Sequence, residues 1–198
     1  MSDSPKPESS LIFSIRNYHK AVPYPGSGLR DDGHENYGFK PLKGRSDEAA
    51  LIAEVQDNES LKNALIELND PSTLFFTIGC EKSCNPHNST YWMRGFLEFA
   101  FNYTELVSDA QNYFKLFFDF THLFWEQPTE AAVEYHFQLE GAGFLDADAA
   151  GFTAIVWITT LAMPSEEVTK KTWSQALDLL VKYLKSVPVN PALRGRMY

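Results

Sequence analysis

A pattern of strand, loop, strand and helix occurs twice between residues 74 and 187, and it constrains the fold more than any other feature of the chain. The expected strands, recognised by alternating or continuous apolar residues, lie at 74–78, 91–101, 133–140 and 152–163. Thr104 and Ser165 are the expected N-caps of the two long helices, and each helix carries one broad apolar stripe. The units share a pattern rather than a sequence.

Hairpins that are each followed by a helix favour antiparallel strands with the helices gathered on one face. We therefore expect an α+β fold with an antiparallel sheet of four or five strands and two long helices on one face. A helical region at 46–68 precedes the two units and packs at an edge, with Ser46 as its first cap and Asn58 as a second. Residues 46–187 then form a single domain, and a chain of 198 residues can supply its core.

The two ends of the chain lack the regular pattern of strands and helices that predicts this domain. Residues 1–45 are expected to form an irregular arm, because glycine and proline are dense between 21 and 45. A short edge strand at 11–15 is its one regular candidate. Residues 188–198 form a tail that is either loose or docked on its own or a neighbouring chain, so a homodimer is one possible arrangement.

The charge of the chain bears on its partners. The net charge is −9, and residues 46–164 hold four basic against eighteen acidic side chains. Nucleic-acid binding needs clustered lysine and arginine, so we expect no nucleic-acid partner. A basic protein partner fits the acidic body better, because opposite fields speed encounter. The alternative is that the charge serves solubility alone.

The apolar residues and the cysteines bear on location. No uncharged apolar run reaches 18 residues, so we expect no membrane-spanning helix. The first 20 residues contain charges throughout and lack the apolar stretch of a signal peptide. Two cysteines and no export signal lead us to expect a reducing, cytoplasmic location.

Two of the expected strands place polar and aromatic side chains on one face. The candidate binding residues are Trp92, Arg94, Phe96, Glu98, Glu134, His136 and Glu140. Alternate residues of a strand lie on the same face, about 7 Å apart along the strand. The candidate residues of each strand can therefore line the floor of a cleft. A carboxylate beside a histidine can serve acid–base catalysis, which makes His136, Glu134 and Glu98 the catalytic alternative. The simpler interpretation is that this polar face is the solvent-exposed side of the sheet, or that a second layer of helices covers it.

The segment 79–90, expected to be a loop, contains the only two cysteines. Cys80 and Cys84 have a spacing that a zinc site allows, and His87 is a possible third ligand. A structural zinc needs four ligands, so a further histidine would have to come from elsewhere in the fold. A disulfide is the second interpretation, and two unpaired thiols are the one we favour. We therefore predict no metal and no cofactor.

These observations favour a non-catalytic, acidic binding protein that engages a basic protein partner. It would be of the immunity, inhibitor or chaperone type. Several small binding proteins, among them secretion chaperones and toxin-neutralising immunity proteins, resemble it in the order helix, hairpin, helix, hairpin, helix and in an acidic body, although fold alone does not determine function. The alternative is a small enzyme or ligand-binding protein with a pocket between sheet and helices, using Glu134 and His136. The sequence contains none of the common hydrolase, metalloprotease or zinc-deaminase motifs, which favours the first hypothesis.

Overall fold

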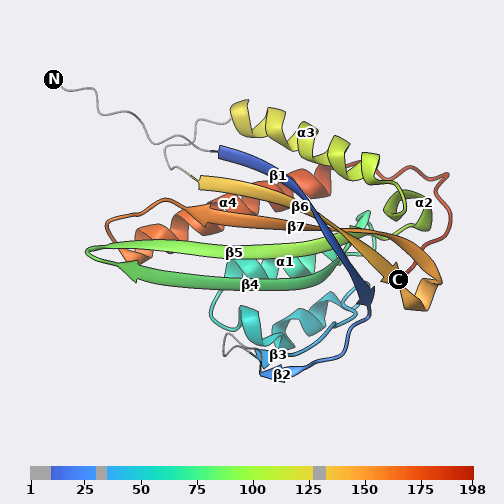
Figure 1. Ribbon diagram of the computed structural model, residues 1–198, viewed down its shortest axis with the longest axis horizontal. Coiled ribbons are helices and arrows are strands. Elements are labelled where there is room, and N and C mark those ends of the chain that lie inside the picture. Colours follow the sequence, from blue (N-terminus) through green and yellow to red (C-terminus); the bar gives the residue numbers. More distant parts are fainter. Residues whose placement is uncertain (1–9, 30–34, 127–132) are drawn as a thin grey trace.

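The computed structural model describes residues 10–29, 35–126 and 133–198, and in these ranges the chain forms a five-stranded mixed sheet packed against helices (Figure 1). The strand order is β1-β6-β7-β5-β4. These strands are β1 (Ser10–Val22), β4 (Phe75–His87), β5 (Thr90–Phe101), β6 (Val133–Phe144) and β7 (Ala149–Thr160). A second, two-stranded sheet pairs β2 (Gly28–Leu29) with β3 (Glu35–Asn36). The helices are η1 (Ser46–Leu51), η2 (Ala53–Val55), α1 (Glu59–Leu68), α2 (Thr104–Val107), α3 (Ala110–Glu126), η3 (Leu145–Ala147) and α4 (Glu166–Ser186).

The predicted α+β class is confirmed, but the predictions of an antiparallel sheet and of two strand, loop, strand and helix units are only partly right. Hairpin β4–β5 and hairpin β6–β7 are antiparallel, and they join through antiparallel pairing of β5 with β7. Strand β1 pairs parallel with β6, which makes the sheet mixed. A parallel neighbour needs a long connection, and here the whole chain between β1 and β6 provides it.

Strand β1 is much longer than the predicted strand at 11–15. It follows β6 from Ser10 to Arg16, shifts register at a bulge, and continues to Val22. Residues 10–22 therefore belong to the main sheet rather than to an irregular arm, and residues 1–9 of the predicted arm lie outside the described residues. The second half of β1 was not predicted because residues 16–20 are mostly polar and show no apolar alternation.

The predicted loop at 79–90 is wrong, and the strand predicted at 133–140 ends too early. Strand β4 runs through to His87, and Asn88, with φ of 55°, begins a tight turn into β5. Strand β4 lies at the sheet edge, where one side of the strand has no neighbouring strand and polar residues can continue the ladder. Strand β6 likewise continues through Gly141 to Phe144, and only η3 separates it from β7.

Helices α1, α3 and α4 pack on one face of the sheet, and α1 and α4 lie behind it in Figure 1. The predicted apolar stripes are buried, with Phe117 and Phe120 of α3 on β6 and Trp173 of α4 on β7. The predicted caps Asn58 and Ser165 accept hydrogen bonds from the main-chain N–H groups of Leu61 and Val168.

Two other predicted helix starts are wrong. Ser46 lies inside the first turn of η1, which follows Arg45. The single helix expected from Thr104 is broken into α2 and α3, because Asp109 accepts a hydrogen bond from the N–H group of Gln111 and begins a new helix.

The opposite face of the sheet is covered only at one end. There, Phe76 of β4 packs against Phe39, Phe144 and the ring of Tyr198. The C-terminal tail docks at this end, since Asn102 binds both the N–H and the C=O group of Tyr198. A groove runs over a further part of this face.

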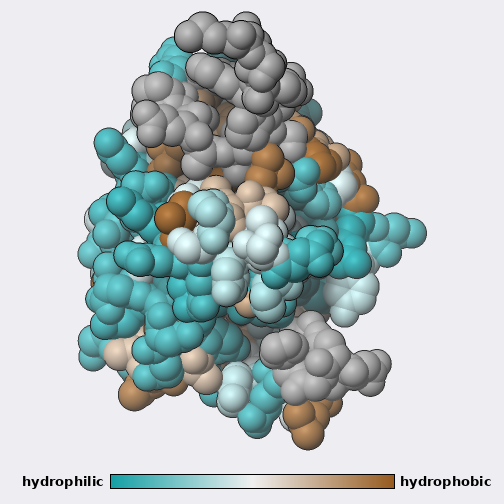
Figure 2. All heavy atoms as spheres, turned by 90° about the vertical axis from the view of Figure 1, so that its left-hand side faces the viewer, coloured by the Kyte–Doolittle hydropathy of each residue, from teal (hydrophilic) through white to brown (hydrophobic). Residues whose placement is uncertain are grey.

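Figure 2 looks at the end that carries the β4–β5 turn, and it shows mainly hydrophilic residues there. Within the described residues, none of the helices is both long enough and apolar enough to cross a membrane.

Gly95 provides a test of the contact between β5 and α4. A Cβ atom at Gly95 would lie 2.5 Å from Cζ2 of Trp173 and 2.6 Å from the carbonyl oxygen of Glu81. Both neighbours are fixed, so we expect Gly95→Ala to lower the free energy of unfolding by about 2–3 kcal/mol in a urea titration. Gly143→Ala is the matched control, because its Cβ would meet nothing closer than 3.5 Å. Equal effects of the two substitutions would contradict the close packing.

Candidate functional site

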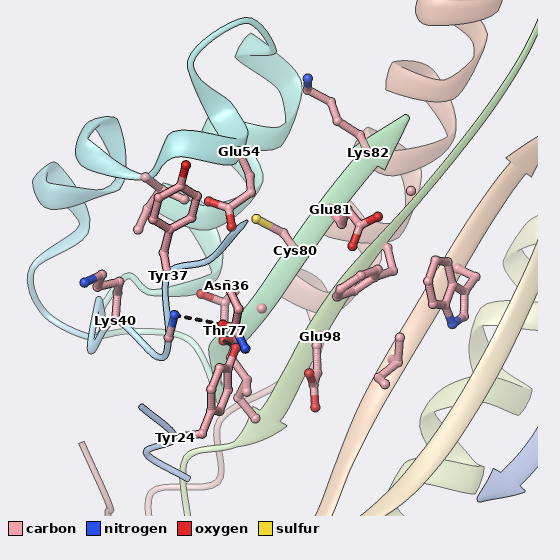
Figure 3. A pocket seen from close by; sticks show the side chains of 18 of the residues that line it. Tyr24, Asn36, Tyr37, Lys40, Glu54, Thr77, Cys80, Glu81, Lys82 and Glu98 are labelled. Atoms are coloured by element: carbon pink, nitrogen blue, oxygen red, sulfur yellow. Dashed lines mark hydrogen bonds between the residues drawn. The ribbon is translucent and has the colours of Figure 1, made fainter. Parts of the chain in front are cut away.

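A groove of about 1620 Å³ runs over the face of the sheet opposite the helices. Its floor comes from β1, β5, β6 and β7, one side is the edge strand β4, and the other wall is the segment 35–57 (Figure 3). The chain leaves β1 after Val22, forms β2 and β3, and returns through η1 and η2 beside β4.

A buried ionic cluster forms the floor. The ammonium of Lys20 lies 2.6 Å from Glu98 Oε1 and 3.3 Å from Glu140 Oε2. Glu140 Oε1 also accepts from Arg16 Nη1 at 3.1 Å and from Gln138 Nε2 at 2.6 Å. Both carboxylates are almost fully buried, so they depend on these donors. We call Arg16, Lys20, Glu98 and Glu140 the ionic cluster.

Burial and the Lys20 ammonium act in opposite directions on Glu98. Burial raises the pKa of Glu98, and the positive charge of Lys20 and its hydrogen bond to the carboxylate lower it. The net pKa lies above the ordinary value of a glutamate, because burial has the larger effect. Tyr24 lies beside this carboxyl group and donates a hydrogen bond to the carbonyl oxygen of Ile78 at 3.1 Å.

An aromatic platform lies further along the floor. Phe96 and Trp157 are register partners on β5 and β7, and their ring centroids are 4.7 Å apart. Arg94 places its guanidinium carbon 4.2 Å from the centroid of the Trp157 ring, which is a cation–π contact. Arg94 is exposed, and its charge therefore faces the open groove.

The opposite wall carries negative charge. Tyr37 is exposed; a hydrogen bond from its hydroxyl to Glu35 raises its pKa, and the charges of Glu35 and Glu54 raise it further. The charge of Glu54 also raises the pKa of Tyr24 and of Cys80, so this carboxylate acts on both sides of the groove. No described residue forms an ion pair with Glu54. Lys40 lies on the same wall and is also exposed.

His136 and Glu134 share the polar face of β6, as their spacing predicted. The Ser14 hydroxyl lies 2.6 Å from Nε2 of His136. Burial lowers the pKa of His136, while the negative charge of Glu134 raises it, and the net shift is downward. His136 is therefore neutral at pH 7, and Nε2 can accept a hydrogen bond from Ser14.

The structure brings most of the candidate residues to one face but not into one cluster. The groove is lined by Trp92, Arg94, Phe96, Glu98 and Glu140. Glu134 and His136 lie on the same face of the sheet, outside the lining of the groove. The two polar strands β5 and β6 are not neighbours in the sheet, because β7 lies between them. Lys20 spans this gap by binding Glu98 and Glu140 together.

Sequence reasoning missed the residues that come from the first 57 positions. Lys20, Tyr24 and Glu54 were assigned to the arm or to a helical region, and nothing local links Lys20 to Glu98, 78 positions away. The one local sign that Lys20 belongs to a buried strand is its position next to the apolar residues Ala21 and Val22.

The cysteine segment is not arranged as a metal site. Cys80 and Cys84 lie four residues apart on one strand, about 13 Å along β4, and both are free thiols. His87 has the opposite strand parity and points to the other face. Burial raises the pKa of the Cys80 thiol to about 12, which makes it a poor nucleophile. Within residues 10–29, 35–126 and 133–198, no three histidine, cysteine or acidic side chains gather into a metal-binding group.

Comparisons of the chain with protein-family models, with curated proteins and with solved structures found no match. The site must therefore be interpreted from its own chemistry.

Lys20→Met tests the ionic cluster. We expect the substitution to lower the free energy of unfolding by about 3 kcal/mol near pH 8, because two buried carboxylates lose their shared cation. The pKa of Glu98 is already raised in the folded state, and it rises further without Lys20. The folded variant then takes up a proton more readily than the unfolded chain, so its deficit relative to the parent protein shrinks as the pH falls toward about 5.

Urea titrations at several pH values measure this effect. Arg16→Met is the control: the Arg16 side chain is 62% exposed, and we expect a loss below about 1 kcal/mol. A deficit of Lys20→Met that is the same at every pH would show that the carboxylates do not depend on this ammonium.

Proposed function

We propose that this protein is a non-catalytic binding protein that holds an extended segment of a basic protein partner in the groove. The observation that carries the proposal is the aromatic platform of Phe96 and Trp157, which faces a wall bearing Glu35 and Glu54. An inhibitor, an immunity protein or a chaperone acting in a reducing cytoplasm would be a protein of this kind.

The size of the groove supports a macromolecular ligand. Small-molecule pockets are usually about 300–1,000 Å³ and enclose most of the ligand. At about 1620 Å³, the groove exceeds that range, and it is partly open to solvent. An extended peptide segment matches such a channel better than a compact metabolite does.

The chemistry of the groove supports a segment that is basic on one side and apolar on the other. Aromatic side chains in concave sites often carry most of the energy of a protein interface, and Trp157 is partly exposed in this position. Glu54 lies across the groove without an ion pair among the described residues, and can receive a lysine or arginine. The net charge of −9 favours encounter with a basic partner.

The ionic cluster has a different role in this proposal from the one expected from the sequence. Lys20 and Arg16 already neutralise Glu98 and Glu140, so these carboxylates hold the floor together instead of recruiting a basic partner. Recognition then depends on Glu35, Glu54 and the aromatic platform. Arg94 adds a cation at the platform, where it suits a carboxylate or a main-chain carbonyl of the bound segment.

Selection of peptides from a random 12-residue library on the immobilised protein tests the proposal. We expect enriched peptides to contain lysine or arginine together with an aromatic or aliphatic residue. Their affinity, measured by fluorescence anisotropy, should fall about tenfold with Trp157→Ala and several-fold with Glu54→Gln. Binding should also weaken as salt is added.

Two matched variants control for general effects on the surface. Leu145→Ala removes an exposed apolar side chain outside the groove, and Glu167→Gln removes an exposed carboxylate on α4. Both should leave peptide affinity unchanged. Acidic or uncharged peptides, or binding that Trp157→Ala does not affect, would contradict the proposal.

A hydrolytic enzyme is the second candidate, and one contact favours it. Ser14 and His136 form a hydrogen-bonded pair of the kind that activates a serine nucleophile, and a lowered pKa keeps the histidine available as a base. The pair lies on the open face of the sheet rather than between the sheet and the helices. The groove-lining residues Arg94 and Trp157 are close to it on the same face.

A fluorophosphonate probe distinguishes this candidate. If Ser14 is activated, its oxygen forms a bond to phosphorus, fluoride leaves, and His136 takes the serine proton. Mass spectrometry would then find the adduct on Ser14 and find it lost in His136→Gln. An unlabelled Ser14, under conditions in which an added serine hydrolase is fully labelled, removes the enzyme candidate.

A further inference from the structure

Exposed apolar side chains gather at the β1 edge of the sheet, on the side away from β4. Ile15 is 67% exposed, Phe118 of α3 is 60% exposed and Phe13 is 41% exposed. Phe13 stacks on Phe118, with ring centroids 5.9 Å apart, so strand and helix contribute to one surface. Ile12 is also exposed, on the opposite face of the strand. We call Phe13, Ile15 and Phe118 the β1 patch.

The edge beside this patch lacks the features that usually prevent strand pairing. Natural edge strands are protected by charges, prolines, bulges or short length. Residues 10–15 contain no charge and no proline, and they pair regularly with β6 for about 20 Å. The first charged residue, Arg16, is drawn onto Glu140, and the bulge occurs only between Arg16 and His19. Strand β1 is the last strand of its sheet, so its outer side has no neighbouring strand in the described part of the chain.

The lack of charge along the β1 edge determines which kind of partner can bind there. A molecule with a net charge of −9 repels its own copies over most of its surface. At the β1 edge residues 10–15 are neutral, and Lys115 and Asp119, the charged residues closest to Phe118 in the sequence of α3, form an ion pair 3.2 Å long. Two copies can therefore approach here without like charges facing each other, whereas a strongly charged partner finds no complementary group.

We propose that two copies of this chain associate through β1, with residues 11–15 of each copy paired antiparallel about a two-fold axis at Phe13. Residues that face each other across an antiparallel pair point to the same face of the sheet. The two-fold axis therefore brings Phe13, Ile15 and Phe118 of both copies into one apolar cluster beneath the two α3 helices. The two five-stranded sheets become one continuous ten-stranded sheet. This inference does not depend on the proposed function of the groove.

Light scattering coupled to size-exclusion chromatography, repeated over a range of protein concentrations, tests the association. We expect twice the mass of the 22.5 kDa chain at high concentration. Ile15→Lys should yield a monomer and raise the dissociation constant at least about a hundredfold, because the two-fold axis places two lysines in the apolar cluster. Leu51→Lys is the control, since Leu51 is 80% exposed and lies on the wall of the groove.

Circular dichroism shows whether Ile15→Lys is folded, and a second measurement identifies the interface without relying on that variant. Single cysteines placed in turn at positions 11–15, in a chain with Cys80→Ser and Cys84→Ser, should form an intermolecular disulfide only near the two-fold axis. A monomer at every concentration overturns the proposal. So does a dimer that Ile15→Lys leaves intact, or one in which no cysteine at 11–15 forms a crosslink.

Discussion

The Lys20 ammonium is the interaction on which the open face of the sheet depends. Two glutamates from different strands are buried within reach of it, and its ammonium lies 2.6 Å from one carboxylate and 3.3 Å from the other. By binding both, Lys20 fastens the edge strand β1 to β5 and β6 across the width of the sheet. It also fixes the point at which the chain turns away to build the wall of the groove. One cation thus connects the edge of the sheet with the floor of the site.

Local patterns predicted the parts of this fold that depend on neighbouring residues. Alternation assigned Trp92 and Phe96 to one face of a strand, and the side-chain caps at Asn58 and Ser165 are where the sequence placed them. The order of the strands was not predictable in this way, because the local sequence of β5 or of β7 does not specify which strand it pairs with. The polar stretch of β4 also looked like a loop, since an edge strand needs no apolar pattern to keep its hydrogen bonds.

The candidate site was predicted in part, for the same physical reason. Its aromatic floor comes from strands whose faces the alternation defines. Its charged lining comes from Lys20 and Glu54, in segments whose position is set by tertiary contacts alone. The result separates two surfaces of different chemistry: a mixed-charge groove bounded by β4, and a neutral apolar edge along β1. A two-fold axis at that edge would leave both grooves open on the same side of the sheet, suited to two segments of one partner.

The strand order also determines when the sheet can be completed during synthesis. Strand β7 lies in the middle of the sheet, yet it is the last of the five strands to leave the ribosome. Until it emerges, β4–β5 is an isolated hairpin, and β1 has only the newly made β6 as a partner. Such long-range pairing slows folding and leaves apolar strands temporarily uncovered. A cell making this protein therefore has to keep the nascent chain from aggregating until β7 has been made.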